Sequence, residues 1–378
     1  MSSHAPHGTP PLRAVLVLSG RSAGVSSHVR SLAAGLVARG VRVTVCAPTE
    51  TELIHRYTAV GAQHISVPAR SDPASVAALR TACTGVDVVH AHGVSTGLRA
   101  ALALGGRRTP LVLSLHAGAH AEGARERLLR VLERRAARAA SVVLGASADL
   151  VDRARASGAR DARLAAVALA GARRGQPVGA VGPDHKARAE LGAVDRPLLV
   201  TIGALEPYRG YGPLLDAARA WRRLDPAPLL AVAGEGTLRA ALQRRIDDED
   251  LPVTLLGTRE DARDLLAAAD LALLPPCARP CSVLAQEALH ARVPLVAPDS
   301  GDIAELVGDA AEIVPHGDAG ALAAAVTRLL ADPARRKVLR DRGEARAASW
   351  PTEDETVAQV LSVYDELIHP PAPSGAWG

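Results

Sequence analysis

The sequence predicts an α/β protein with two domains, each built on a parallel sheet that helices cover on both sides. In both halves, short apolar runs alternate with amphipathic runs of helical length, which is the pattern of parallel α/β sheets. A chain of 378 residues, 48% of them hydrophobic, can bury two cores of ordinary size. Between the halves, residues 176–196 carry Gly, Pro and isolated charges without apolar periodicity, which indicates a linker.

The N-terminal domain is expected over residues 13–175, after a disordered segment at 1–12. A small-residue loop at 19–24 follows the first strand, and a helix follows that loop at about 25–39. A long helix is predicted over 119–140, and 141–147 reads as a further strand followed by a helix cap. The other apolar runs that predict strands are 13–18, 41–47, 65–68, 88–92 and 111–116.

The C-terminal domain is expected over residues 197–350. Its last predicted strand, 294–297, has no polar face, as in a sheet covered on both sides. After it, 353–368 repeats apolar residues at helical spacing, and the tail at 370–378 should be disordered. The earlier predicted strands of this domain are 197–202, 229–234, 253–257 and 271–274.

Composition excludes several classes of protein. No apolar run approaches the roughly 20 residues that cross a bilayer, and the first residues lack an export signal, so we expect a cytoplasmic protein. Four cysteines in a chain of this length do not make a disulfide framework. With no Phe and 2% aromatic residues there is little to stack on bases, so no nucleic-acid partner is predicted.

Charge is distributed unevenly along the chain. Residues 1–180 hold 23 basic and 10 acidic residues, a balance of +13, whereas the remainder has 21 basic and 30 acidic residues, a balance of −9. The N-terminal half is therefore expected to meet something anionic, such as a phosphorylated acceptor or the inner face of a membrane. The arginine-rich helix at 119–140 is either a solvated face or a peripheral membrane contact.

One stretch, 274–307, has the composition of a phosphate-binding unit. Prolines at 275, 276 and 280 prevent regular structure before a helix that runs from Ser282 to about residue 291. The backbone N–H groups at such a helix start, around Ser282, Val283 and Leu284, suit a phosphate, and Glu287 follows one and a half turns later. Any doubly wound fold contains units of this kind, so the pattern by itself is weak.

The same stretch resembles the donor-binding segment of family-4 retaining glycosyltransferases, which have the GT-B fold of two Rossmann-like domains facing a cleft. In that family a Glu-x7-Glu motif binds the donor and a Gly-Gly-x-x-Glu turn follows a strand. Glu287 fills the second motif position and Glu305 the turn position, whereas Arg279 stands where the first Glu is expected. The resemblance spans residues 13–368, and it implies that the last helix (351–369) crosses back to pack on the N-terminal domain.

A second motif of the family is its donor-phosphate loop, in which a Gly-Arg pair is followed a few residues later by a Lys-Gly pair. Arg209 fills the Lys position and Ala204 replaces the Arg. Cations are needed there because negative charge grows on the leaving diphosphate. The resemblance also assigns Gly234 to the nucleotide-lining turn, and it assigns Gly257 with Thr258 to the region that holds the base.

In the N-terminal half, Gly24 and Ser26 lie in and just after the segment that resembles the family's first glycine loop. His92 and His116 end two predicted strands, where ligands gather in open α/β sheets. A strand-end histidine is more often structural, but the resemblance assigns both to the acceptor side and places His116 near the reacting carbon. A zinc site at His90-x-His92 finds no further ligands with suitable spacing, so no metal is predicted.

The resemblance implies metal-independent transfer of a sugar, with retention, from a UDP or GDP sugar to an unidentified acceptor that is anionic or lipid-linked. His116, Arg209 and Glu287 would be catalytic, and no separate cofactor is needed. Because a cation is lost at Ala204 and one is gained at Arg279, either Arg279 supplies the missing countercharge or the site has decayed to a weak binder or scaffold. A nucleotide-sugar epimerase or phosphorylase on the same architecture is the third alternative.

Overall fold

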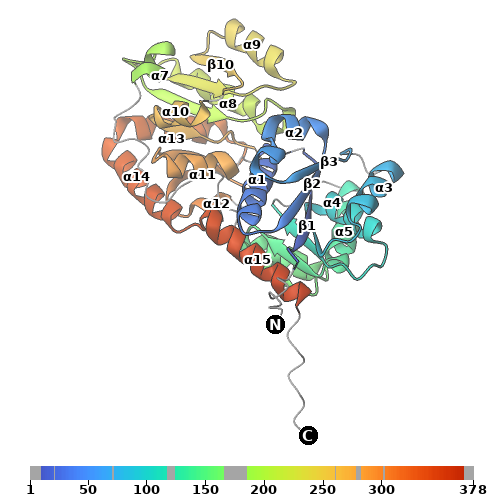
Figure 1. Ribbon diagram of the computed structural model, residues 1–378. Helices are drawn as coiled ribbons and strands as arrows, with labels where there is room; N and C mark the ends of the chain where they lie inside the picture. The colour runs from blue at the N-terminus through green and yellow to red at the C-terminus, as the bar shows by residue number, and fades with distance from the viewer. Residues whose placement is uncertain are drawn as a thin grey trace, which may run out of the picture. The chain divides into compact units, whose positions relative to one another are not determined.

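A computed structural model describes residues 10–20, 22–69, 72–116, 124–165, 185–259, 261–277, 282–300 and 303–369. The chain divides into two compact units (Figure 1). Unit 1 comprises Met1–Ala172 and Pro351–Gly378, and unit 2 comprises Arg173–Trp350. Each contains one parallel sheet, so the predicted α/β class with two Rossmann-like domains is confirmed.

The sheet of unit 1 has the order β3-β2-β1-β4-β5-β6-β7, and every pairing in it is parallel. The chain winds outward from β1 to β3 and then returns to place β4 on the other side of β1, which creates a switch point between β1 and β4. The strands are β1 (Arg13–Val17), β2 (Arg42–Ala47), β3 (Gln63–Ser66), β4 (Val88–His92), β5 (Leu111–Leu115), β6 (Val142–Gly145) and β7 (Ala162–Leu164).

Helices cover both faces of this sheet. In β1, Ala14 and Leu16 enter one buried cluster, whereas Val15 and Val17 enter the other. This two-sided burial explains why the strands read as continuous apolar runs. The helical segments of unit 1 are α1 (Ala23–Ala38), α2 (Thr49–His55), the 3-10 turn η1 (Tyr57–Val60), α3 (Pro73–Ala82), α4 (Val94–Leu104), α5 (Ala124–Ala139), α6 (Ala148–Ala156) and α15 (Glu353–Ile368).

The last helix, α15, packs against the N-terminal part of the chain, as the resemblance implies. It starts with a capping box between Thr352 and Glu355, and it lies alongside α1 (Figure 1). Gly35 on α1 permits this approach, because a Cβ there would lie 2.5 Å from Val357 Cγ2. At the other end of α15, the fully buried Tyr364 places its hydroxyl 2.7 Å from His90 Nδ1.

Unit 2 repeats this plan with the parallel order β10-β9-β8-β11-β12-β13, and its switch point lies between β8 and β11. The strands are β8 (Leu198–Ile202), β9 (Leu229–Ala233), β10 (Val253–Gly257), β11 (Leu271–Leu273), β12 (Leu295–Asp299) and β13 (Ala311–Pro315). The helical segments are α7 (His185–Glu190), η2 (Pro207–Arg209), α8 (Tyr211–Trp221), α9 (Arg239–Asp248), α10 (Ala262–Ala267), α11 (Ser282–His290), α12 (Ile303–Val307), α13 (Ala319–Ala331) and α14 (Pro333–Ala348).

Two elements differ from the sequence-based expectation. Helix α7 lies inside the predicted linker, where the buried Arg188 binds Asp270 (Nη1–Oδ2, 3.0 Å) and the Ala193 carbonyl. Strand β3 covers 63–66 and not 65–68. Of the predicted helix at 119–140, residues 124–139 are helical, and 119–123 lie outside the described residues. The predicted disordered ends lie largely outside the described residues, and no described helix is both long and apolar enough to cross a membrane.

Candidate functional site

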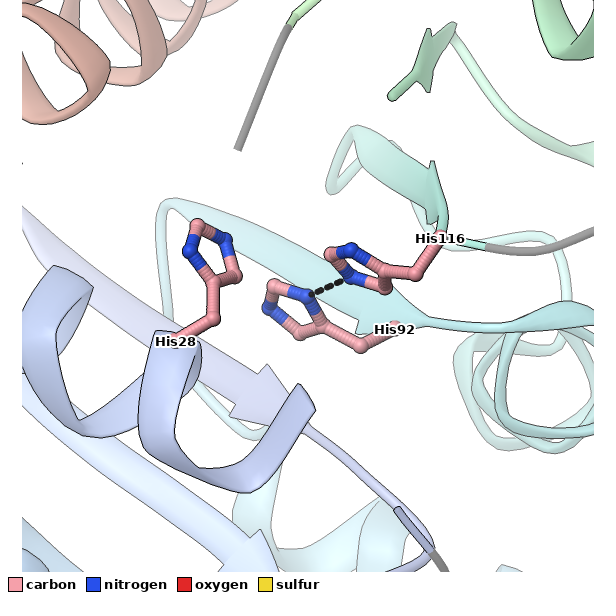
Figure 2. Close-up of side chains that lie close together, drawn as sticks. All are labelled: His28, His92 and His116. Carbon is pink, nitrogen blue, oxygen red and sulfur yellow. Dashed lines mark hydrogen bonds between the residues drawn. The ribbon is translucent and has the colours of Figure 1, made fainter. Parts of the chain in front are cut away.

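Three histidines lie together at the carboxyl ends of three neighbouring strands of unit 1, β1, β4 and β5. His28 lies in the second turn of α1, the helix that follows β1. His92 is the last residue of β4, and His116 directly follows β5. Because β1, β4 and β5 are adjacent at the switch point, the three rings meet (Figure 2).

These three rings, called the histidine cluster below, touch one another directly. His92 Nδ1 and His116 Nε2 lie 3.0 Å apart, with the rings stacked at an interplanar angle of 13°. The ring of His28 meets the other two edge-on, with centroid distances of 5.8 Å to His92 and 5.2 Å to His116. The cluster lies largely out of solvent, since His28 and His92 are 7% and 4% exposed and His116 is half-buried.

A further ring, His90, holds the cluster in place without joining it. Its two nitrogens lie 2.7 Å from Tyr364 Oη and 2.8 Å from Ser114 Oγ, so both are hydrogen-bonded. Its ring stacks on His92 at a centroid distance of 4.3 Å. The Thr96 hydroxyl also donates to the His92 carbonyl at 2.6 Å. His92 is therefore fixed from behind by its ring neighbour and by its backbone.

Burial keeps these imidazoles neutral. It lowers the pKa of His28 to about 4 and, with a smaller effect from His28, the pKa of His90 to about 3. The pKa values of His92 and His116 also fall well below 6.5, first through burial and then through repulsion by the neighbouring imidazoles. At neutral pH each ring therefore offers a lone pair as well as an N–H group.

The structure brings the predicted His92 and His116 together, and it adds His28, which the sequence analysis missed. The prediction that Gly24 lies in a loop is wrong. Helix α1 already begins at Ala23, and the Ser22 side chain accepts from Val25 N, so Gly24 lies in the first helical turn. Ser26 is buried in the same helix, two residues before His28.

In unit 2 the loops that flank the switch point pack against each other. Arg209 ends η2, and Gly210 follows with a φ of 77°. A Cβ at Gly210 would lie 2.9 Å from Cys277 Cβ and 3.1 Å from the Pro276 carbonyl carbon, so the loop after β8 touches the loop after β11. The Ser300 hydroxyl donates to the Cys277 carbonyl at 2.8 Å, which adds the end of β12 to the same region.

Glycines also allow the loops that follow β8 and β9 to pack against each other and against the end of β10. Gly234 has a φ of 144°, and a Cβ there would lie 2.0 Å from the Gly203 carbonyl oxygen. Its N–H donates to the Gly257 carbonyl at 2.7 Å. The Thr237 hydroxyl donates to Glu206 at 2.9 Å, which fixes the loop after β9 against the loop that carries Arg209.

The other predicted donor residues are distributed as follows. Glu287 is half-buried on α11, and burial raises its pKa while the Arg263 charge opposes that change. Glu305 is exposed in α12, and its carbonyl accepts from Arg346 Nη2 at 2.6 Å.

The remaining predicted positions lie at the start of α11 and after β10. Helix α11 begins at Ser282 and continues through Val283 and the buried Leu284. Thr258 directly follows β10, whereas Arg279 lies outside the described residues.

Gly257 therefore ends β10, Gly234 directly follows β9, and Arg209 lies in the loop after β8, the neighbour of β9; α11 starts a few residues after Cys277. This arrangement places backbone amides and a guanidinium beyond the carboxyl ends of the strands. Such a site suits a pyrophosphate, because amides and a fixed cation stabilise negative charge.

Two family descriptions match the chain, and they match it in order. "Glycosyl transferase 4-like domain" matches residues 23–170, and "Glycosyl transferases group 1" matches residues 196–332. The first matched region contains the histidine cluster, and the second contains the glycine-lined loops. The chain belongs to the family-4 glycosyltransferases.

Among the curated relatives of this glycosyltransferase is the "GDP-mannose-dependent alpha-(1-6)-phosphatidylinositol monomannoside mannosyltransferase" of Mycolicibacterium smegmatis, 32% identical over 200 residues. That match covers 48% of this chain and 52% of the relative, so the chain spans about half of its length. Alpha-D-kanosaminyltransferase of Streptomyces kanamyceticus is 27% identical over 281 residues, which covers 68% of this chain and 71% of that protein.

Among solved structures, Anabaena HepE in complex with UDP superimposes with a TM-score of 0.76. The likeness covers 93% of this chain and all of that one at 19% identity, and it shows the GT-B fold.

The contact between the two loops at the switch point can be tested by adding a methyl group. Gly210→Ala forces a left-handed backbone on an L-residue and brings Cβ against Cys277, so we expect it to lower the free energy of unfolding by about 1–3 kcal/mol. Gly212→Ala is the matched control, because nothing lies within 4 Å of its Cβ position. Urea unfolding of both variants measures the difference, and equal stabilities would contradict the contact.

Proposed function

We propose that this protein transfers a sugar from a nucleoside-diphosphate sugar to an acceptor hydroxyl, with retention of the anomeric configuration. The observation that carries the proposal is the packing of the loop that holds Arg209 and Gly210, after β8, against the loops after β9 and β11. The relatives named for transferase activity support it, as does the binding of UDP by HepE.

The diphosphate would be held by Arg209 and by the N–H groups at the start of α11. The half-buried Arg209 guanidinium packs over the ring of Tyr208 at 5.4 Å, which positions the charge at the loop. Glu287 lies in the second turn of α11, and by resemblance it would accept hydrogen bonds from the ribose hydroxyls. Gly234 and Gly257 would let the nucleotide approach the backbone, since neither presents a side chain.

In the reaction, the bond between the anomeric carbon and the phosphate oxygen breaks, and the acceptor oxygen bonds to the same face of that carbon. The acceptor's proton passes to the departing phosphate oxygen, so no protein nucleophile is required. Negative charge grows on the diphosphate as it leaves, and a cation fixed beforehand lowers the barrier. By resemblance His116 would contact the sugar near the reacting carbon.

Two differences from the family motif define the competing function, a binder or scaffold without activity. Ala204 is exposed at the loop where the family has an arginine, so one stabilising cation is missing there. Such a loss costs about 2.7–4 kcal/mol in other enzymes. If Arg279 supplies the countercharge, turnover is retained with an altered donor preference. If it does not, the protein binds nucleotide sugars without turning them over.

The donor assignment is tested with purified full-length protein and a panel of UDP and GDP sugars, by calorimetry and by release of nucleoside diphosphate. We expect Arg209→Ala to raise the donor Kd and to lower kcat by roughly 100- to 1,000-fold. Arg209→Lys keeps the charge and should recover part of that loss. Arg223→Ala, an exposed arginine beyond the end of α8, is the control and should change neither value.

Unchanged donor binding in Arg209→Ala would show that the phosphate lies elsewhere. Saturable binding without release of nucleoside diphosphate from any sugar would favour the inactive binder. An epimerised nucleotide sugar, or a released sugar phosphate, would instead revive the epimerase or phosphorylase alternative.

We also propose that the acceptor side works at an anionic membrane surface. The solvent face of α5 carries basic residues with two apolar ones between them, Leu128 and Val131, which are 59% and 45% exposed. This combination favours peripheral contact with anionic headgroups. The exposed arginines of the helix are Arg127, Arg130, Arg134, Arg135 and Arg138.

Vesicle sedimentation tests this surface. We expect binding to phosphatidylglycerol vesicles, weaker binding at high salt, and none to phosphatidylcholine alone, because headgroup attraction is about 1 kcal/mol for each arginine near the surface. The double variant Arg130→Glu/Arg134→Glu should lose the binding, whereas Arg223→Glu should retain it. Equal binding to both kinds of vesicle, or none to either, would contradict the proposal.

A further inference from the structure

The histidine cluster contains a polar atom that the described structure leaves without a partner. His92 Nε2 is fully enclosed and makes no hydrogen bond there, although the side chain is only 4% exposed. The ring is held close to this position, because His90 stacks on one face and His92 Nδ1 is engaged with His116. Leaving such a buried group unpaired is unfavourable, so a ligand at this position would be stabilising.

Beside the cluster lies a small enclosed hollow of about 10 Å³, bordered by His28 and His116. Its wall also includes Thr356 of α15, whose buried hydroxyl has no partner among the described residues. A volume of this size holds roughly one water molecule or one ion and no organic ligand. The hollow therefore limits the occupant to something small.

The arrangement of ring nitrogens favours an ion. One nitrogen from each of His28, His92 and His116 can be chosen so that all three lie within 4.8 Å of one another. A tetrahedral zinc with Zn–N bonds of about 2.1 Å places its ligand nitrogens about 3.4 Å apart. The rings therefore need to close by about 1.4 Å at most, which small side-chain rotations supply. In Figure 2 the second nitrogen of His92 lies on the His28 side of its ring.

We propose that His28, His92 and His116 form a binding site for one divalent transition-metal ion of the zinc class. Three histidines with an open fourth position are an established zinc coordination, and neutral imidazole is the ligand form. The cluster already holds its rings neutral through burial. His90 acts as a support, since its bonds to Tyr364 and Ser114 fix the ring against which His92 rests.

A site of this kind is not visible from sequence spacing. His90 and His92 are two residues apart, but only His92 joins the ligand set, and its partners come from α1 and from the end of β5. The site lies within unit 1, so its test needs no sugar donor and remains valid even if the transferase proposal fails. With the ion bound, His116 is a metal ligand and does not make the sugar contact that the resemblance implies.

The experiment uses tag-free, EDTA-stripped, full-length protein, titrated with Zn²⁺ by calorimetry and with Co²⁺ by visible absorption. We expect one Zn²⁺ per chain and a Co²⁺ spectrum typical of nitrogen ligands in a tetrahedral site. Loss of an outer-shell partner usually costs 10- to 100-fold in metal affinity, so His28→Ala, which removes a ligand, should weaken binding by at least about 100-fold. His316→Ala, an exposed histidine of unit 2, should leave it unchanged.

Circular dichroism establishes that each variant is folded before titration. Should the buried His28→Ala fail to fold, His116→Ala carries the test, because its half-buried ring leaves a smaller void. The proposal is overturned if the wild type shows no saturable binding of Zn²⁺, which would leave a water molecule as the occupant. It is equally overturned if folded His28→Ala or His116→Ala binds Zn²⁺ as the wild type does.

Discussion

The sites of this protein depend on one constraint, the reversal of winding in each parallel sheet. At the switch points between β1 and β4 and between β8 and β11, the connections leave in opposite directions, so the strand ends there are not covered by their own helices. In unit 2 the opening is lined by backbone, because Gly210 lets one loop touch Cys277 and Gly234 lets another touch Gly203. In unit 1 it is lined by imidazoles.

Much of the fold could be predicted because its strands are buried on both faces. The runs at 88–92 and 253–257 became β4 and β10 without a shift, and the last helix matched 353–368. Where burial is weaker, prediction was poorer. Strand β3 is polar and largely exposed, so its position was shifted by two residues. Helix α7 is short and charged, and only the buried ion pair of Arg188 reveals why it is ordered.

The sites divide in the same way. The glycines of the proposed donor loops were singled out because they recur at motif spacing, and the structure gives a reason for each: Gly234 lies against the Gly203 backbone, and Gly257 has a φ of 73°. The histidine cluster could be predicted only in part. His92 and His116 end strands, but His28 lies on a helix, and only the adjacency of β1 to β4 shows that it meets them. Spacing along the chain instead drew attention to His90, whose nitrogens are both occupied.

The two clusters of groups differ in chemistry, which argues for a division of labour between the units. The loops of unit 2 present amides and a guanidinium, which suit a phosphate, whereas unit 1 presents neutral imidazoles and an arginine-rich helix. A family-4 glycosyltransferase that binds its donor through unit 2 must therefore show nucleotide contacts only at the carboxyl ends of the strands of that unit.

Hydrogen–deuterium exchange of the full chain with saturating UDP or GDP measures these contacts most directly. The account predicts slower exchange at residues 203–212, 234–237 and 282–287, with β13 and α13 unchanged; unchanged exchange in those three segments, or protection confined to other parts of the chain, would contradict it.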